Sequence, residues 1–156
     1  IYPYYRLQEV ENCTVDLATP NGEVMFGKYG VPARANVSAN TLSADDYDLV
    51  VIPGGFEAPD RLRIIKEVTD FVSDMNKKGK LIATICHGPW VCISAKIVKG
   101  KKATAYIAVK DDLENAGATY VDSNIVIDGN LISSPHYRDN PIWMKTVVEA
   151  LENLRK

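Results

Sequence analysis

The sequence lacks several features that define large functional classes. It has no apolar run that reaches the ~18 residues of a membrane-spanning helix, and no segment with the features of a signal peptide. It also lacks a basic character, since 18 Lys and Arg stand against 20 Asp and Glu, with a formal net charge of -2. We therefore expect a cytoplasmic protein that binds neither nucleic acid nor membranes, because both partners favour a basic surface.

Cysteine is scarce, and its spacing restricts the chemistry further. Cys13, Cys86 and Cys92 are the only cysteines, and no two of them form a Cys-x-x-Cys pair. An odd number at irregular spacing argues against a disulfide framework and against a structural zinc site. We expect reduced thiols, as in a cytosolic chain, and no metal or other cofactor.

Apolar residues alternate between short β-branched runs and longer stretches with helical spacing. Residues 48–52 and 81–85 are compact apolar runs, and helical stretches follow them at 61–78 and 90–98. This alternation predicts an α/β fold with a mostly parallel sheet, and 156 residues suit one domain. The other expected elements are a helix over 5–11, strands at 14–18, 103–106, 120–121, 125–127 and 131–132, a helix at 111–116 and a terminal helix at about 140–156.

The junction between the strand at 81–85 and the next helix carries the strongest chemical signal. Its sequence is Cys86-His87-Gly88-Pro89. A parallel strand that runs straight into a helix turns sharply and lifts the residue at the turn out at the carboxyl end of the sheet, where α/β proteins bind ligands. The start of a helix favours an anion, which here is the thiolate of Cys86. We therefore predict that Cys86 is a nucleophile, whereas core packing explains Cys92.

His87 is the candidate general base for Cys86. Adjacent side chains usually diverge, so this role requires the turn to bring the imidazole to the thiol and a third group to orient it. The alternative is a histidine that only fills the turn. Asp60 could orient His87, within the subunit or across an interface, or could be an ordinary carboxylate at a helix start. His136 either lines the same pocket or lies on a surface loop.

Gly54 and Gly55 follow the strand at 48–52 and suggest an oxyanion hole. Their exposed backbone N–H groups, together with the N–H of His87, could stabilise a negative charge beside Cys86. The alternative is an ordinary turn at the end of a strand. The segment is not a phosphate loop, because no Gly-Lys-Ser/Thr follows it.

Several segments in sequence order together resemble the ThiJ/PfpI family, and most closely its PfpI intracellular proteases. These segments are Val51-Ile52-Pro53-Gly54-Gly55, Ala83-Thr84-Ile85-Cys86-His87-Gly88-Pro89, Ile93-Ser94-Ala95, residues 111–118 and residues 126–131. The resemblance extends over nearly the whole chain. It implies a flavodoxin-like three-layer sandwich with a mostly parallel central sheet, of the class I glutamine-amidotransferase-like superfamily.

The resemblance also implies roles for individual residues. It implies Cys86 as the nucleophile with His87 beside it, and the N–H groups of Gly55 and His87 as oxyanion donors. Tyr106 matches a tyrosine that lines the family's pocket. In PfpI-like proteins an acidic residue of a neighbouring subunit completes the site, and the matching position is Asp60, where glutamate is usual.

Two departures from the family pattern concern the pocket and the sheet. Pro135 stands where an arginine is common, which changes the expected charge of the pocket. The family's first strand, and the glutamate after it that hydrogen-bonds the nucleophilic cysteine, have no counterpart in residues 1–156. We therefore expect one ThiJ/PfpI domain over 1–156 that lacks its first strand in this sequence.

These features favour an intracellular cysteine hydrolase, a peptidase or amidase that works through an acyl-Cys86 intermediate. One alternative is a glutathione-independent glyoxalase or deglycase, in which Cys86 adds to the aldehyde of methylglyoxal and forms a hemithioacetal. Another is a non-enzymatic sensor of oxidative stress, whose thiolate oxidises to sulfenic or sulfinic acid. The expected partners are a small peptide or a reactive carbonyl substrate, and further copies of the chain in a dimer or hexamer.

Overall fold

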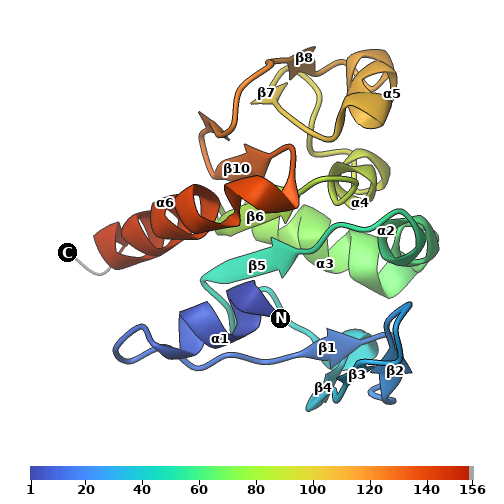
Figure 1. Cartoon of the computed structure of the whole chain (residues 1–156), viewed down its shortest axis with the longest axis vertical. Helices are drawn as coiled ribbons and strands as arrows, with labels where there is room; N and C mark the ends of the chain where they lie inside the picture. The colour runs from blue at the N-terminus through green and yellow to red at the C-terminus, as the bar shows by residue number, and fades with distance from the viewer. Residues whose placement is uncertain (155–156) are drawn as a thin grey trace.

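A twisted sheet with the strand order β5-β6-β10-β9 forms the centre of the fold in the computed structural model, which describes residues 1–154 (Figure 1). The strands are β5 (Leu49–Ile52), β6 (Leu81–Ile85), β10 (Leu131–Ser134) and β9 (Val126–Asp128). β5, β6 and β10 are parallel, and β9 pairs antiparallel with β10. The predicted α/β class and mostly parallel sheet are therefore confirmed.

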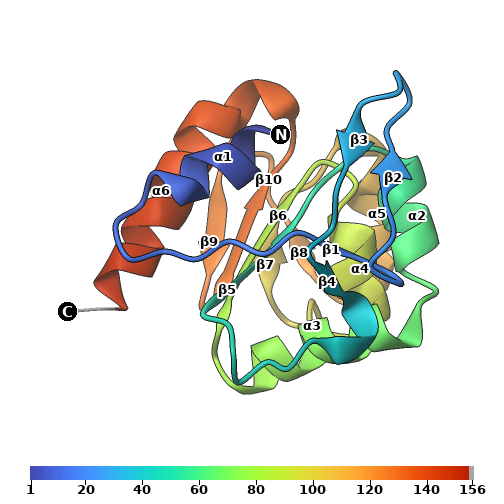
Figure 2. The same ribbon diagram turned by 90° about the horizontal axis from the view of Figure 1, so that it is seen from below.

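Helices cover both faces of this sheet and create the three layers (Figure 2). One face carries α2 (Glu57–Leu62), α3 (Lys66–Lys77), α4 (Pro89–Ser94) and α5 (Lys110–Asn115), and the other carries α1 (Tyr2–Gln8) and α6 (Asn140–Asn153). Ile82 of β6 packs with the first group, whereas Ala83 and Ile85 pack with the second. Because β6 is covered on both faces, its sequence is a continuous apolar run, as expected of a buried parallel strand.

The remaining elements are short and lie at the periphery. β1 (Ala18–Thr19) pairs with β4 (Val37–Ser38), β2 (Met25–Phe26) with β3 (Pro32–Ala33), and β7 (Lys102–Ala103) with β8 (Thr119–Tyr120). Single turns of 3-10 helix occur at Ala39–Thr41, Ile107–Val109 and Tyr137–Asp139.

Several sequence predictions about helices need correction. The helix predicted over 61–78 is present over Lys66–Lys77 as α3, but Ile65 has extended backbone angles that separate it from α2. Asp60 consequently lies within α2 and does not open the long helix. The helix predicted over 90–98 ends at Ser94, and Lys96 then has a left-handed φ of 59° that cannot continue it. The terminal helix ends at Asn153, and residues 155–156 lie outside the described part of the chain.

Two strand predictions were too long. Only Ala18 of the strand predicted over 14–18 is in a strand, and only Ala103 of the one predicted over 103–106. Each belongs to a two-residue parallel pair beside the main sheet, so the flanking residues have no ladder to join. The hairpin predicted from Asp128-Gly129 is confirmed, since Asp128 lies opposite Leu131 and Gly129 has a φ of 59°.

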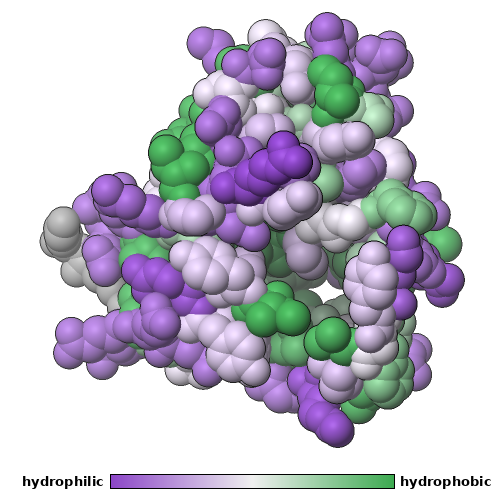
Figure 3. All heavy atoms as spheres, viewed as in Figure 1, coloured by the Kyte–Doolittle hydropathy of each residue, from purple (hydrophilic) through white to green (hydrophobic). Residues whose placement is uncertain are grey.

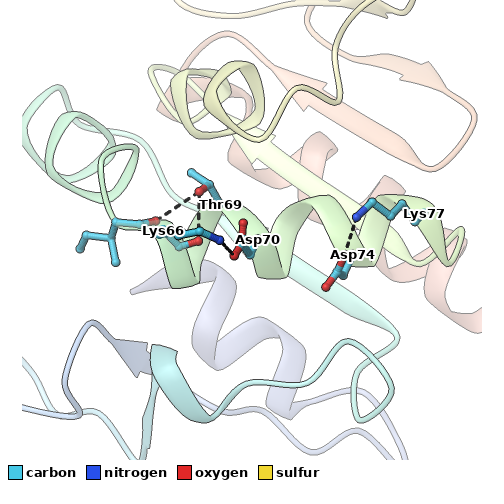
Figure 4. A network of polar contacts seen from close by, with 6 residues as sticks. Lys66, Thr69, Asp70, Asp74 and Lys77 are labelled. Carbon is cyan, nitrogen blue, oxygen red and sulfur yellow. Dashed lines mark hydrogen bonds and ion pairs between the residues drawn. The ribbon is translucent and has the colours of Figure 1, made fainter.

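Helix α3 has one solvent-exposed face with charged side chains, shown in Figure 4, and one face buried in the core. Lys66 pairs with Asp70, and Asp74 accepts a hydrogen bond from Lys77 at 2.8 Å. The Lys77 ammonium lowers the pKa of Asp74, and Asp70 raises the pKa of Lys66. Exposed pairs of this kind contribute little to stability, so α3 depends on its buried face. That face consists of Phe71, Val72 and Met75.

An apolar cavity of about 530 Å³ runs along the outer edge of β5. Val51 of β5, Ala18 of β1, Val72 of α3 and Leu7 of α1 contribute to its walls. Within residues 1–154, β5 pairs only with β6, so this edge carries no strand. Figure 3 shows an opening on this face, between the surface over β5 and that over β1. A further parallel strand could pair with β5 here, and the expected lack of the family's first strand stays a prediction.

No helix in residues 1–154 is both long enough and apolar enough to cross a bilayer.

Candidate active site

Cys86 lies at the sharp turn between β6 and α4. Its φ is +63°, a left-handed conformation that is unusual for a residue other than glycine. The turn is held from both sides, because the Cys86 N–H donates to the carbonyl of Ser134 at 2.9 Å and the Cys86 carbonyl accepts from the N–H of Tyr106 at 3.0 Å. Strained backbone of this kind persists only where the surroundings fix it, and it is common at functional sites.

Two glycines allow the chain to pack closely around Cys86. A Cβ on Gly54 would lie 2.6 Å from the Cys86 Cβ and 3.4 Å from its Sγ. A Cβ on Gly88 would lie 2.7 Å from the carbonyl oxygen of Ile52 and 3.0 Å from that of Ile85. The ends of β5 and β6 therefore meet at the thiol only because both positions lack a side chain.

Gly88→Ala should destabilise the protein, because the new methyl group meets rigid backbone oxygens. We expect a loss of about 1–3 kcal/mol in the free energy of unfolding, as for other overpacked positions, measured by urea denaturation. Gly27→Ala is the matched control, since its Cβ would make an ordinary 3.6 Å contact and its φ is not positive. Equal stability of the two variants would contradict the close packing at Gly88.

His87 lies against the thiol. Its Nδ1 is 3.2 Å from the Sγ of Cys86, so the structure brings the two predicted residues together. The imidazole also stacks on Tyr106 and contacts the edge of Trp90, with 5.0 Å between ring centroids in each case. Partial burial lowers the pKa of His87 below its ordinary value of 6.5. A neutral imidazole can accept the thiol proton, which is what a general base at this position requires.

The backbone N–H groups predicted to form the oxyanion hole are available for a ligand. Within residues 1–154, none of the N–H groups of Gly54, Gly55 and His87 donates a hydrogen bond. Gly55 has a φ of +82°, a conformation that other residues rarely adopt, and it follows Gly54, which touches Cys86. These properties suit an oxyanion hole, and the assignment of its donors stays a prediction.

Asp60 and His136 are placed differently from His87. Asp60 is exposed on α2, and its carboxylate makes no hydrogen bond or ion pair with any residue in 1–154. The structure therefore does not join Asp60 to His87 within the subunit, and a role across an interface stays a prediction. His136 follows β10, near the strand end that bonds Cys86, but its Nδ1 accepts from the N–H of Arg138 at 3.2 Å. Its ring packs on Tyr137.

Sequence reasoning missed Trp90, which contacts the His87 ring. Trp90 lies one helical turn after His87, and residues three apart on a turn are neighbours. That spacing was the available signal. The partners of Trp90 are Asp112 and Arg63, which come from distant parts of the chain, so no local pattern could have indicated them.

The Cys86 thiol, the His87 imidazole and backbone amides without a hydrogen-bond partner lie at the carboxyl ends of β5 and β6. This arrangement suits thiol chemistry. Residues 1–154 contain no group of three or more His, Cys, Asp or Glu side chains that could hold a metal ion. The expected absence of a cofactor stays a prediction.

Comparison with known proteins identifies the family. The model of the DJ-1/PfpI family matches residues 1–150. The chain belongs to the DJ-1/PfpI family. The resemblance inferred from the sequence is thereby confirmed, together with the flavodoxin-like fold.

Relatives of this DJ-1/PfpI protein carry different names. "Deglycase PfpI" of Pyrococcus furiosus is 40% identical over 152 residues, which cover 97% of this chain and 90% of that protein. "Putative cysteine protease YraA" of Bacillus subtilis is 33% identical over 132 residues, covering 85% and 78%. A crystal structure of a protein from Anabaena variabilis, with DJ-1/ThiJ/PfpI-like and ferritin-like domains, is 36% identical with a TM-score of 0.92. The match covers 97% of this chain and 44% of that longer one.

Proposed function

We propose that this protein is a cysteine-dependent enzyme that acts on reactive carbonyl compounds, as a deglycase or glyoxalase. The observation that carries the proposal is the 3.2 Å pair of Cys86 Sγ and His87 Nδ1, which packs against Gly54 in a loop whose amides have no hydrogen-bond partner within residues 1–154. Such a pair can make a thiolate, and such amides can hold the oxygen of a carbonyl under attack. The similarity to a relative named as a deglycase supports this substrate class over a peptide.

The first step would be addition of Cys86 to the aldehyde of methylglyoxal. His87 takes the thiol proton, and the thiolate forms a C–S bond with the aldehyde carbon. The electron pair of the C=O bond moves to the oxygen, which the N–H groups of Gly55 and His87 stabilise. The imidazolium then gives its proton to this oxygen, which yields a hemithioacetal and a neutral His87.

The second step would move hydrogen between the two substrate carbons. His87 removes the proton from the carbon bonded to sulfur, and the resulting enediol is reprotonated at the neighbouring carbon. The former aldehyde carbon becomes a thioester, and the former ketone becomes an alcohol, so oxidation and reduction balance within the substrate. Water hydrolyses the thioester to lactate and the free thiol. In a methylglyoxal adduct of an amine, the C–N bond would break and the hydroxyl proton would pass to nitrogen, which gives the free amine and methylglyoxal; the methylglyoxal then follows the same two steps.

The hydrolase predicted first from the sequence is the second candidate. The same thiolate and oxyanion donors could attack an amide carbonyl and form an acyl enzyme. The relative YraA, named as a cysteine protease, favours this hypothesis. The residues of the site do not separate the two reactions, because both need one nucleophile and one oxyanion site. The oxidative-stress sensor stays a prediction.

The decisive experiment compares two substrates with one protein preparation. We expect lactate to accumulate from methylglyoxal, and amines to be freed from their methylglyoxal adducts, without cleavage of casein or short fluorogenic peptides. Peptide cleavage without lactate would overturn the proposal in favour of the hydrolase. Rapid conversion of Cys86 to sulfinic acid by peroxide, without turnover of either substrate, would overturn it in favour of the sensor.

A further inference from the structure

We infer that Trp90 is a positioning residue for His87, and that Asp112 and Arg63 hold it in place. We call these three residues the Trp90 cluster. The inference deepens the proposed function and rests on it, because it concerns the base that serves Cys86.

The first observation is how the His87 ring is held. Its Nδ1 faces the Cys86 Sγ, whereas Nε2 has no hydrogen-bond partner among residues 1–154. No carboxylate in the described chain therefore fixes the imidazole plane. Two aromatic rings contact it instead, Tyr106 stacked at 28° between planes and Trp90 edge-on at 66°. Together they limit rotation of the ring away from the sulfur.

The second observation is that Trp90 is itself anchored on two sides. Its Nε1–H donates to the Asp112 carboxylate of α5 at 2.8 Å. The guanidinium carbon of Arg63, which follows α2, lies 5.6 Å from the centre of the Trp90 ring, within cation–π range. Arg63 in turn donates from Nε to the Ser94 hydroxyl at 3.1 Å. Segments from α2, α4 and α5 thus converge on one indole.

The consequence concerns the proton that His87 must accept. Two ionisable side chains, those of Cys86 and Tyr106, contact the imidazole directly. Two others, those of Arg63 and Asp112, contact Trp90 instead. Partial burial lowers the pKa of His87, and the rings of Trp90 and Tyr106 contribute to that cover. A looser Trp90 would expose the imidazole and let it leave the thiol. The pKa of His87 would then rise toward its ordinary value of 6.5. Cys86 would react more slowly, and the pH below which protonation of His87 stops the reaction would be higher.

The test uses variants that differ in one hydrogen bond. Trp90→Phe and Asp112→Ala each remove the indole–carboxylate bond, whereas Asp112→Asn keeps an oxygen acceptor. Asp111→Ala, an exposed neighbour on α5, is the matched control. The readouts are the rate of Cys86 alkylation by iodoacetamide as a function of pH, followed by mass spectrometry, and the rate of lactate formation. Denaturation by urea verifies that each variant is folded.

We expect Trp90→Phe and Asp112→Ala to lower both rates roughly 3- to 10-fold, the range for one hydrogen bond, and to move the acidic limb to higher pH. Asp112→Asn and Asp111→Ala should stay within about twofold of the parent. The double variant should lose no more than either single one, because both remove the same bond. Unchanged alkylation in Trp90→Phe and Asp112→Ala, or additive losses in the double variant, would overturn the inference.

The two readouts separate this inference from the proposed function. Alkylation needs no substrate, so it tests the Trp90 cluster even if methylglyoxal is not turned over. The predicted shift in alkylation without lactate from the parent protein would support the positioning role and overturn the proposed function. Lactate formation by the parent with no change in the variants would do the reverse.

Discussion

Cys86→Ser should abolish lactate formation, with a loss of more than about 1,000-fold in kcat/KM. A serine hydroxyl keeps its proton near neutral pH and is a much weaker nucleophile than a thiolate. The turn itself should tolerate the change, because Cys86 is held through its backbone N–H and carbonyl. The measurement is the initial rate with methylglyoxal, together with the free energy of unfolding.

Cys13→Ser is the matched control for this loss. Cys13 is also a free, half-buried cysteine, and it lies beside the cavity along β5, away from the turn at Cys86. We expect it to keep the parent rate. A Cys86→Ser variant that is folded and retains more than about a tenth of the parent rate would show that the thiol is not the nucleophile.

His87→Gln should produce the second largest effect, a fall of about 100- to 10,000-fold in kcat, which is the usual contribution of a general base. Glutamine can still make a hydrogen bond but cannot accept and return the proton. The rates of parent and variant with methylglyoxal measure this effect. A loss below about tenfold would indicate that His87 only fills the turn.

The pH dependence of the parent provides a second test of His87. Its pKa is lowered from 6.5 by burial, so the imidazole remains neutral in moderately acid solution. A neutral base is required, so the parent's activity should decline as the pH falls through a value below 6.5. His87→Gln should lack this acidic limb. A parent limb above 6.5 would contradict a desolvated imidazole.

The strand and turn that carry the thiol were predictable because local signals agree there. Residues 81–85 form a continuous apolar run, and Gly88 and Pro89 follow immediately, so strand, turn and helix start coincide. The break between α2 and α3 was not predictable in the same way. Apolar positions keep helical spacing across Ile65, whereas the chain leaves the helix after Leu62 and is extended at Ile65 before α3 begins at Lys66.

The contacts around the active site were not predictable, because they join segments that are distant in the sequence. The approach of Gly54 to Cys86 joins the ends of two strands, and the bond from Trp90 to Asp112 joins α4 to α5. Sequence spacing does not record such contacts. It likewise could not separate a peptidase from a deglycase, because both use the same few residues. The names of the relatives therefore shift the balance toward the carbonyl substrate.

The reactivity of Cys86 toward iodoacetamide as a function of pH tests the central claim most directly. Mass spectrometry would follow alkylation of Cys86 and Cys13 in the same sample. We predict that Cys86 reacts much faster than Cys13 at pH 7. A rate for Cys86 that matches the rate for Cys13 would contradict an activated nucleophile at this turn.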